Sequence, residues 1–119
     1  MNHYTEKEIQ DTLKIVESFI VNCEKVRLKL QDSSPSLSLN TNRLKALYIS
    51  KALLMRQENE YTKNELEKAI IQITSIKNKS TTGIHNAKSG SATYTRFFRL
   101  INAMDIVLAY LLNAIEEYQ

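Results

Sequence analysis

The segment FFRLINAMDIVLAYLLNAIEEY, residues 97–118, decides the fold. Its apolar residues recur at alternating spacings of four and three, which is one stripe of an α-helix. The members of this stripe are Phe97, Ile101, Met104, Leu108, Leu111, Ile115 and Tyr118. Leu100, Ile106, Val107 and Leu112 lie off the stripe, so the helix is apolar on nearly every side. Such a helix is typical of the centre of a bundle or of a dimer contact.

The same spacing rule predicts three more helices upstream, and the helix over 92–118 begins after Ser91 or Thr93. A capping box of Thr5 and Glu8 opens a helix over 5–31, which ends at the turn-forming residues 32–36 around Pro35. Asn40 or Thr41 is expected to cap a helix over 41–57. A second capping box, Thr62 with Glu65, opens a helix over 62–78.

Four helices joined by short connections favour antiparallel neighbours. The sequence therefore predicts an all-α fold, an up-down-up-down antiparallel four-helix bundle in which residues 1–119 form one domain. The expected core includes Leu13, Ile20, Leu47, Ile70, Ile73, Ile101, Leu108 and Leu111.

The last helix has more apolar residues than one bundle interior needs. Ile106, Tyr110 and Leu112 fall off its main stripe. Uncovered apolar surface of this kind usually marks a contact, so the pattern predicts a homodimer formed through the helix over 92–118.

Composition points to a cytoplasmic setting. Cys23 is the only cysteine, so no intramolecular disulfide can form, and the first residues do not resemble a secretory leader. The longest uncharged apolar run, Ile106 to Ile115, is about half of the roughly 20 residues that a bilayer crossing needs. We expect a cytoplasmic protein without a membrane span. The richness in Lys, Asn and Ile is typical of an AT-rich genome, and we expect a bacterial source.

Charge is distributed unevenly along the chain. No acidic residue occurs between Glu67 and Asp105, an interval with six cationic side chains: Lys68, Lys77, Lys79, Lys88, Arg96 and Arg99. Because the whole chain carries +3, the remainder carries −3. A single-sign interval of this length indicates a solvated loop or a surface that meets an anionic partner.

Within this interval, the stretch TTGIHNAKSGSATYTRFFR, residues 81–99, has the composition of an anion-receptive helix start. A helix that begins near Ser91 or Thr93 presents unpaired backbone N–H groups beside the nearby cations. The same hydroxyl residues would also cap the helix. The residues predicted to bind a partner or an anion are Lys77, Lys79, His85, Lys88, Ser91, Thr93, Arg96 and Arg99.

Catalytic and metal chemistry are not expected. His3, His85 and Cys23 have no finger-like or helical ligand spacing, and no Glu-x-x-His pair occurs. Cys23 lies on the apolar stripe of the first predicted helix, where a buried thiol is inert. Lys88-Ser89-Gly90 is not the order of a phosphate-binding loop. We predict no catalytic residue, no metal site, no cofactor and no enzymatic activity.

Residues 85–92, HNAKSGSA, resemble the motif of histidine-phosphotransfer domains, with one residue inserted before the glycine. Those domains are four-helix bundles of about this size. The resemblance implies that His85 would accept a phosphoryl group and that Lys88 would screen its charge.

Two other function classes remain open. One is a non-enzymatic protein that binds a protein partner through the basic loop or the apolar face of the last helix. In architecture alone, small basic bundles of this kind resemble bacteriocin immunity proteins. The other is a nucleic-acid-binding accessory protein that uses the basic interval 68–99. There, Tyr94, Phe97 and Phe98 interleave with Arg96 and Arg99, as stacking platforms do.

Overall fold

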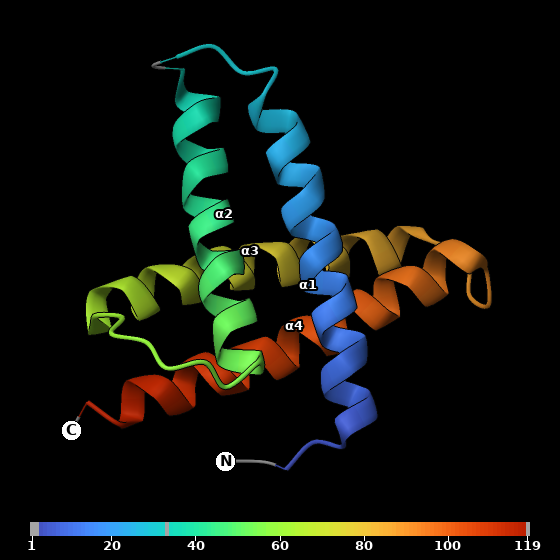
Figure 1. Ribbon diagram of the computed structural model, residues 1–119. Helices are drawn as coiled ribbons and strands as arrows, with labels where there is room; N and C mark the ends of the chain where they lie inside the picture. Colours follow the sequence, from blue (N-terminus) through green and yellow to red (C-terminus); the bar gives the residue numbers. More distant parts are fainter. Residues whose placement is uncertain (1–2, 33, 119) are drawn as a thin grey trace.

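The protein is made of four long helices, which a computed structural model describes for residues 3–32 and 34–118 (Figure 1). In chain order these are α1 (Glu6–Arg27), α2 (Pro35–Leu54), α3 (Lys63–Asn86) and α4 (Ala92–Glu116). The described residues contain no strand. The predicted all-α class and the count of four helices are confirmed.

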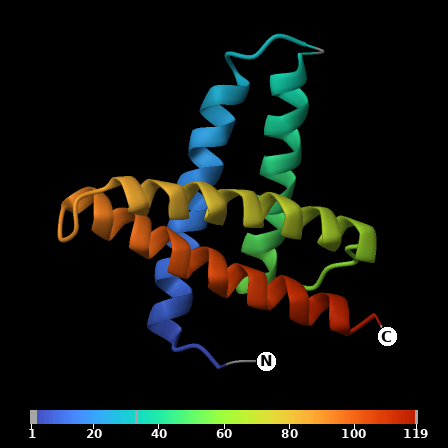
Figure 2. The same cartoon turned by 180° about the vertical axis from the view of Figure 1, so that it is seen from behind.

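The helices form two antiparallel hairpins that cross each other. α1 pairs with α2, α3 pairs with α4, and the first hairpin lies across one face of the second (Figures 1 and 2). The molecule extends 43 × 41 × 20 Å, and its short dimension equals about two helix diameters of roughly 10 Å. The two helices within each hairpin are antiparallel, and the hairpins cross as two layers and do not lie around one common axis (Figures 1 and 2).

This crossing confines the core to the middle of the molecule. Every described residue that is fully buried lies in one of four blocks: 9–20 of α1, 44–54 of α2, 66–80 of α3 and 103–111 of α4. Among the described residues, none between 21 and 43 is fully buried, and none between 81 and 102. Both hairpins therefore project beyond the region where they cover each other.

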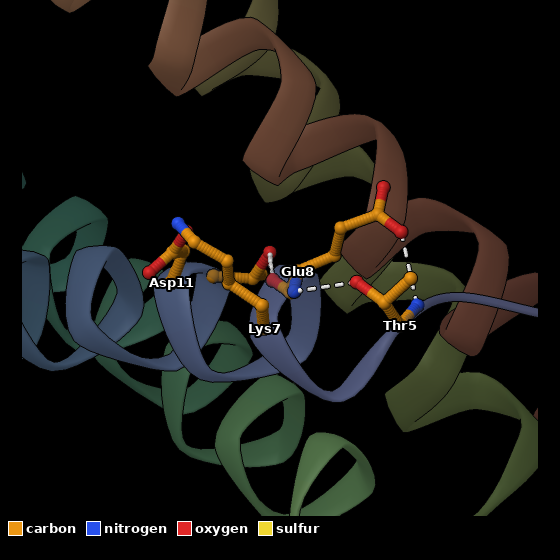
Figure 3. A network of polar contacts seen from close by, with 5 residues as sticks. Thr5, Lys7, Glu8 and Asp11 are labelled. Carbon is orange, nitrogen blue, oxygen red and sulfur yellow. Dashed lines mark hydrogen bonds and ion pairs between the residues drawn. The ribbon is translucent and has the colours of Figure 1, made fainter.

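The predicted capping boxes fix where α1 and α3 begin. The Thr5 hydroxyl accepts a hydrogen bond from the Glu8 backbone N–H at 3.1 Å, and the Glu8 carboxylate accepts one from the Thr5 N–H at 2.9 Å (Figure 3). One turn on, the Lys7 ammonium lies 3.2 Å from Asp11. Thr62 and Glu65 repeat the same reciprocal bonds at α3. Each box satisfies backbone donors that have no partner inside the helix.

The predicted start of α2 was wrong by six residues. Ser34 is the N-cap, since its hydroxyl accepts from the Leu37 N–H at 3.0 Å, and Pro35 occupies the first helical position. Proline is favoured there because the N–H that it lacks would be unpaired in any case. Ser33, part of the predicted turn, lies outside the described residues. α1 ends at Arg27 and α2 at Leu54, earlier than the predicted 31 and 57.

The predicted end of α3 was also wrong, because the helix continues eight residues past 78 to Asn86. The Ser and Thr residues there are weak helix formers, and their hydroxyls donate hydrogen bonds to backbone carbonyls one turn earlier. Ser80 donates to the Ile76 carbonyl at 2.9 Å and Thr81 donates to the Lys77 carbonyl at 3.0 Å. Packing of α3 against α4 stabilises the helix where the helix propensity of its residues is low. The loop between these two helices is therefore short, from 87 to 91.

Most of the predicted core is confirmed. Leu13, Ile20, Leu47, Ile73 and Leu111 are buried, whereas Ile70, Ile101 and Leu108 are only half-buried. Ile101 and Leu108 are half-buried because α4 turns a different side toward the first hairpin than its main stripe suggests, whereas Ile70 belongs to α3 and packs against the outside of the core. The fully buried residues of α4 are Ala103, Met104, Ile106, Val107 and Leu111.

Two of the off-stripe residues on which the predicted homodimer rested make contacts within the chain. Ile106 is buried beside α1, where it lines a cleft with Thr12 and Ile15. Tyr110 stacks on Tyr4, with ring centroids 6.4 Å apart. Of the three, Leu112 alone is exposed, with 52% of its surface open to solvent. The off-stripe residues of α4 therefore do not by themselves indicate self-association.

Adjacent leucines of α4 give a direct test of this burial pattern. Leu111 is 0% exposed and Leu112 is 52% exposed. Leu111→Ala is expected to lower the free energy of unfolding by about 2–5 kcal/mol, because it leaves a cavity in the core. Leu112→Ala is the matched control and is expected to change it by less than about 0.5 kcal/mol in dilute solution. Urea denaturation monitored by circular dichroism measures both, and equal costs would contradict the observed orientation of α4.

Candidate functional site

The basic interval forms the projecting tip of the α3/α4 hairpin. The tip comprises the last turns of α3, the loop 87–91 and the first turns of α4, and it extends past α1 (Figure 1). Lys79, His85, Lys88, Thr93 and Arg96 are all exposed there. The ion pairs that the described residues form use other cations, namely Lys7, Lys45 and Lys77. The tip therefore presents positive charge without a paired carboxylate.

The start of α4 is well ordered by local hydrogen bonds. The Ser91 hydroxyl accepts from the Tyr94 N–H at 3.1 Å, so that of the two predicted caps, Ser91 and Thr93, Ser91 is the N-cap. The Ser91 N–H in turn donates to the Lys88 carbonyl at 3.0 Å. Gly90 has φ +81°, a left-handed conformation that an L-residue with a side chain rarely adopts. The Ser91 hydroxyl is thus engaged in capping α4, and the backbone of Lys88 is fixed in the turn before it.

Close packing joins the two helices of the tip. The far end of the Phe97 ring of α4 abuts Gly83 of α3, where an added Cβ would be 2.5 Å from the Phe97 Cζ. The Arg96 guanidinium lies 5.3 Å from the centroid of the same ring, within the range of a cation–π contact. Phe97 is therefore a packing residue, and its neighbour Phe98 is the exposed aromatic, with 51% of its surface open.

Two of the predicted site residues lie away from the tip. Lys77 is in the middle of α3, where its ammonium pairs with Asp105 of α4 at 2.6 Å. Arg99 lines the cleft between α1 and α4, together with Glu8 and Asp11. The eight predicted residues therefore divide into a tip group of six and two residues with neighbours elsewhere.

His85 does not have the surroundings that the phosphotransfer motif implies. It is exposed in the last turn of α3, and the helix ends one residue later at Asn86. Lys88 lies in the loop, so it is not one turn further along the same helical face. The three-residue spacing of His85 and Lys88 is present in the sequence, but the two residues do not lie on one helix as they do in the motif.

Cys23 is partly buried on α1, and burial raises the pKa of its thiol, an effect that the nearby Arg43 guanidinium opposes. A raised pKa keeps the thiol protonated and slow to react. Within residues 3–32 and 34–118, no group of three or more His, Cys, Asp or Glu side chains is arranged to hold a metal ion.

Sequence reasoning missed a polar cluster between α1, α2 and α3. The Asn40 amide donates to the Cys23 carbonyl at 3.1 Å, and Arg43 donates to the Ser75 hydroxyl at 3.2 Å. Asn40 Oδ1 and Arg43 Nε are buried without a protein partner. The available signal was the spacing, because Asn40 and Arg43 precede the buried Leu47 by seven and four residues and so occupy its helical face.

The chain matches no protein-family profile, no curated protein and no solved structure.

The contact of Phe97 with Gly83 gives a test of the tip. In a helix interior Ala is favoured over Gly by about 1 kcal/mol, so Gly83→Ala would stabilise α3 if space allowed. Because the added methyl group meets the Phe97 ring, we expect Gly83→Ala to destabilise the protein by about 1–3 kcal/mol.

The control is the same substitution made in a Phe97→Ala background, where the methyl group has room. There Gly83→Ala is expected to be neutral or to stabilise by up to about 1 kcal/mol. Urea unfolding of the four variants gives the coupling energy, and additive effects would show that the two residues do not touch.

Proposed function

We propose that this chain is a non-enzymatic cytoplasmic protein that binds an acidic surface of another protein through the tip of the α3/α4 hairpin. The observation that carries the proposal is the charge of the tip, where Lys79, Lys88 and Arg96 are exposed and residues 81–99 contain no carboxylate. A single-sign surface without internal ion pairs attracts the opposite charge and speeds encounter with a complementary partner.

The shape of the tip supports the same proposal. It projects beyond the first hairpin, so a partner can approach it from several sides (Figure 1). The Gly83–Phe97 contact and the Ser91 cap hold its two helices in place. A preorganised surface loses little conformational freedom on binding. A binding role of this kind includes those of immunity-type and regulator-type proteins.

A specific observation favours nucleic acid as a second candidate partner. Phe98 is half exposed and lies beside Arg99, with Tyr94 one turn earlier on the same face of α4. An exposed aromatic ring among cations is the arrangement on which single-stranded bases stack.

The proposal is tested by reversing charge at the tip. We expect Lys88→Glu with Arg96→Glu to weaken binding of a fluorescein-labelled poly-glutamate peptide by about tenfold or more, measured by fluorescence anisotropy at low salt. The matched control is Lys25→Glu with Lys29→Glu near the far end of the α1/α2 hairpin, which gives the same net charge. Retention of affinity in the control locates binding at the tip, whereas equal loss in both variants would mean that only net charge matters.

The same assay separates the two partner classes. Single-stranded DNA is the second probe, and Phe98→Ala is the diagnostic variant. If Phe98→Ala weakens DNA binding by about tenfold and leaves peptide binding unchanged, the nucleic-acid function is favoured, since base stacking contributes about 1–3 kcal/mol per base. If DNA binds no more tightly than the peptide and is insensitive to Phe98, the acidic protein partner stands.

A further inference from the structure

The outer face of the α3/α4 hairpin has no covering layer. The first hairpin lies on one side only, and Figure 2 shows α3 and α4 in front of it with nothing over them. α4 is long and apolar enough to cross a membrane, although core helices of soluble proteins often are too. Only 28% of its most apolar 18-residue segment is buried in the fold. The apolar side chains of α4 thus exceed those that the fold covers.

The side chains of α4 that are exposed or only partly buried form a stripe with four-three spacing. It shares Ile101, Leu108 and Ile115 with the main stripe, and Leu108 and Ile115 also pack against the core. Its members are Tyr94, Phe98, Ile101, Asp105, Leu108, Leu112 and Ile115, and none of them is fully buried. The stripe lies about half a turn around the helix from the buried Ala103 and Val107, which face the first hairpin. Asp105 is its only charged member, and Lys77 of α3 neutralises it.

The stripe is nearly symmetric about Asp105: Phe98 and Leu112 each lie seven residues from it, and the other pairs differ by one residue. Counting outward in both directions gives Ile101 and Leu108, then Phe98 and Leu112, then Tyr94 and Ile115. If two copies of α4 lie antiparallel with Asp105 on a twofold axis, Ile101 meets Leu108 of the second copy and Phe98 meets its Leu112. A face that matches itself under a twofold rotation is what an isologous dimer requires.

Charge at the two ends of the hairpin agrees with this antiparallel order. The tip carries Lys79, Lys88 and Arg96 and no acid. The opposite end carries Glu67, Glu116 and Glu117 against Lys63 and Lys68, and its Glu65 is paired with Lys45 of α2. An antiparallel twofold places the basic tip of each copy beside the acidic end of the other, whereas a parallel arrangement would bring like charges together.

The size of the face is also sufficient. Residues 94–115 of α4 span about 33 Å, and two packed helices are about 20 Å wide, which gives a footprint of about 700 Å² per copy. Stable interfaces bury about 600–1,000 Å² per partner, so this footprint is within their range. We propose that the outer face of the α3/α4 hairpin binds a second copy of this chain, antiparallel, with Asp105 at the twofold axis. This interface adjoins the binding surface proposed at the tip, because Phe98 belongs to the stripe and the basic tip of each copy lies beside the acidic end of the other.

Sedimentation equilibrium over a range of concentrations measures the association. The full chain is expected to dimerise with a dissociation constant on the order of 10 μM or tighter. Leu112→Asp is expected to weaken the dimer by about 30-fold or more, because association would bury two unpaired carboxylates. Leu112 is half exposed in one copy, so this variant should fold, which circular dichroism checks. Leu28→Asp, at a residue 88% exposed on the other hairpin, is the control and should dimerise normally.

Disulfide trapping tests the antiparallel order directly. In a Cys23→Ser background, Phe98→Cys and Leu112→Cys proteins are oxidised separately and as a mixture. Strong cross-linking in the mixture and little in either protein alone supports the proposal, since Phe98 of one copy faces Leu112 of the other.

Three outcomes would overturn it. A monomer at all concentrations up to about 200 μM excludes the dimer. Efficient cross-linking of each single-cysteine protein with itself indicates a parallel arrangement. A protein that is monomeric in buffer but floats with phosphatidylcholine vesicles, and loses this with Leu112→Asp, uses the stripe for a membrane surface.

Discussion

Everything in this molecule depends on the crossing of two helical hairpins. Each hairpin can bury only the part of its surface that the other covers, so the core is limited to the four central blocks of the helices. A bundle with near-parallel axes would cover each helix along its whole length. Here the crossing leaves the ends of both hairpins as two-helix projections, and it leaves the outer face of α3 and α4 open. Both proposed binding surfaces are consequences of this arrangement.

Local chemistry explains which parts of the fold could be predicted from the sequence. The starts of α1, α3 and α4 were predictable because a cap acts within three residues, and Thr5, Thr62 and Ser91 occupy those positions. The start of α2 was not, because Pro35 is compatible with both a break and a first turn, and only the Ser34 cap decides between them. The end of α3 was missed for a different reason. Contacts with α4 extend that helix through residues of low propensity, and such contacts are not visible in a linear pattern.

The candidate site divides in the same way. The positive charge of the tip was predictable, since it follows from composition. The division of the predicted residues was not, because the pairing of Lys77 with Asp105 and the position of Arg99 near α1 depend on how the helices lie beside each other. The main stripe of α4 gave the correct helix but not the side that meets the first hairpin. An apolar helix with two four-three stripes has more than one orientation in which it can bury a face, and the rest of the chain selects among them.

The projecting ends also determine how the protein opens in solution. At the crossing, a backbone amide can exchange its hydrogen only if both layers separate. Toward residues 27–35 and 86–92 the helices have one neighbour each, so local fraying exposes their amides while the centre stays folded. Amide exchange should therefore be slowest near Leu47, Ile73 and Val107 and should accelerate outward along all four helices. The molecule then has a slowly exchanging centre and faster-exchanging hairpin ends, and at the basic tip the Gly83–Phe97 contact and the Ser91 cap limit this local opening.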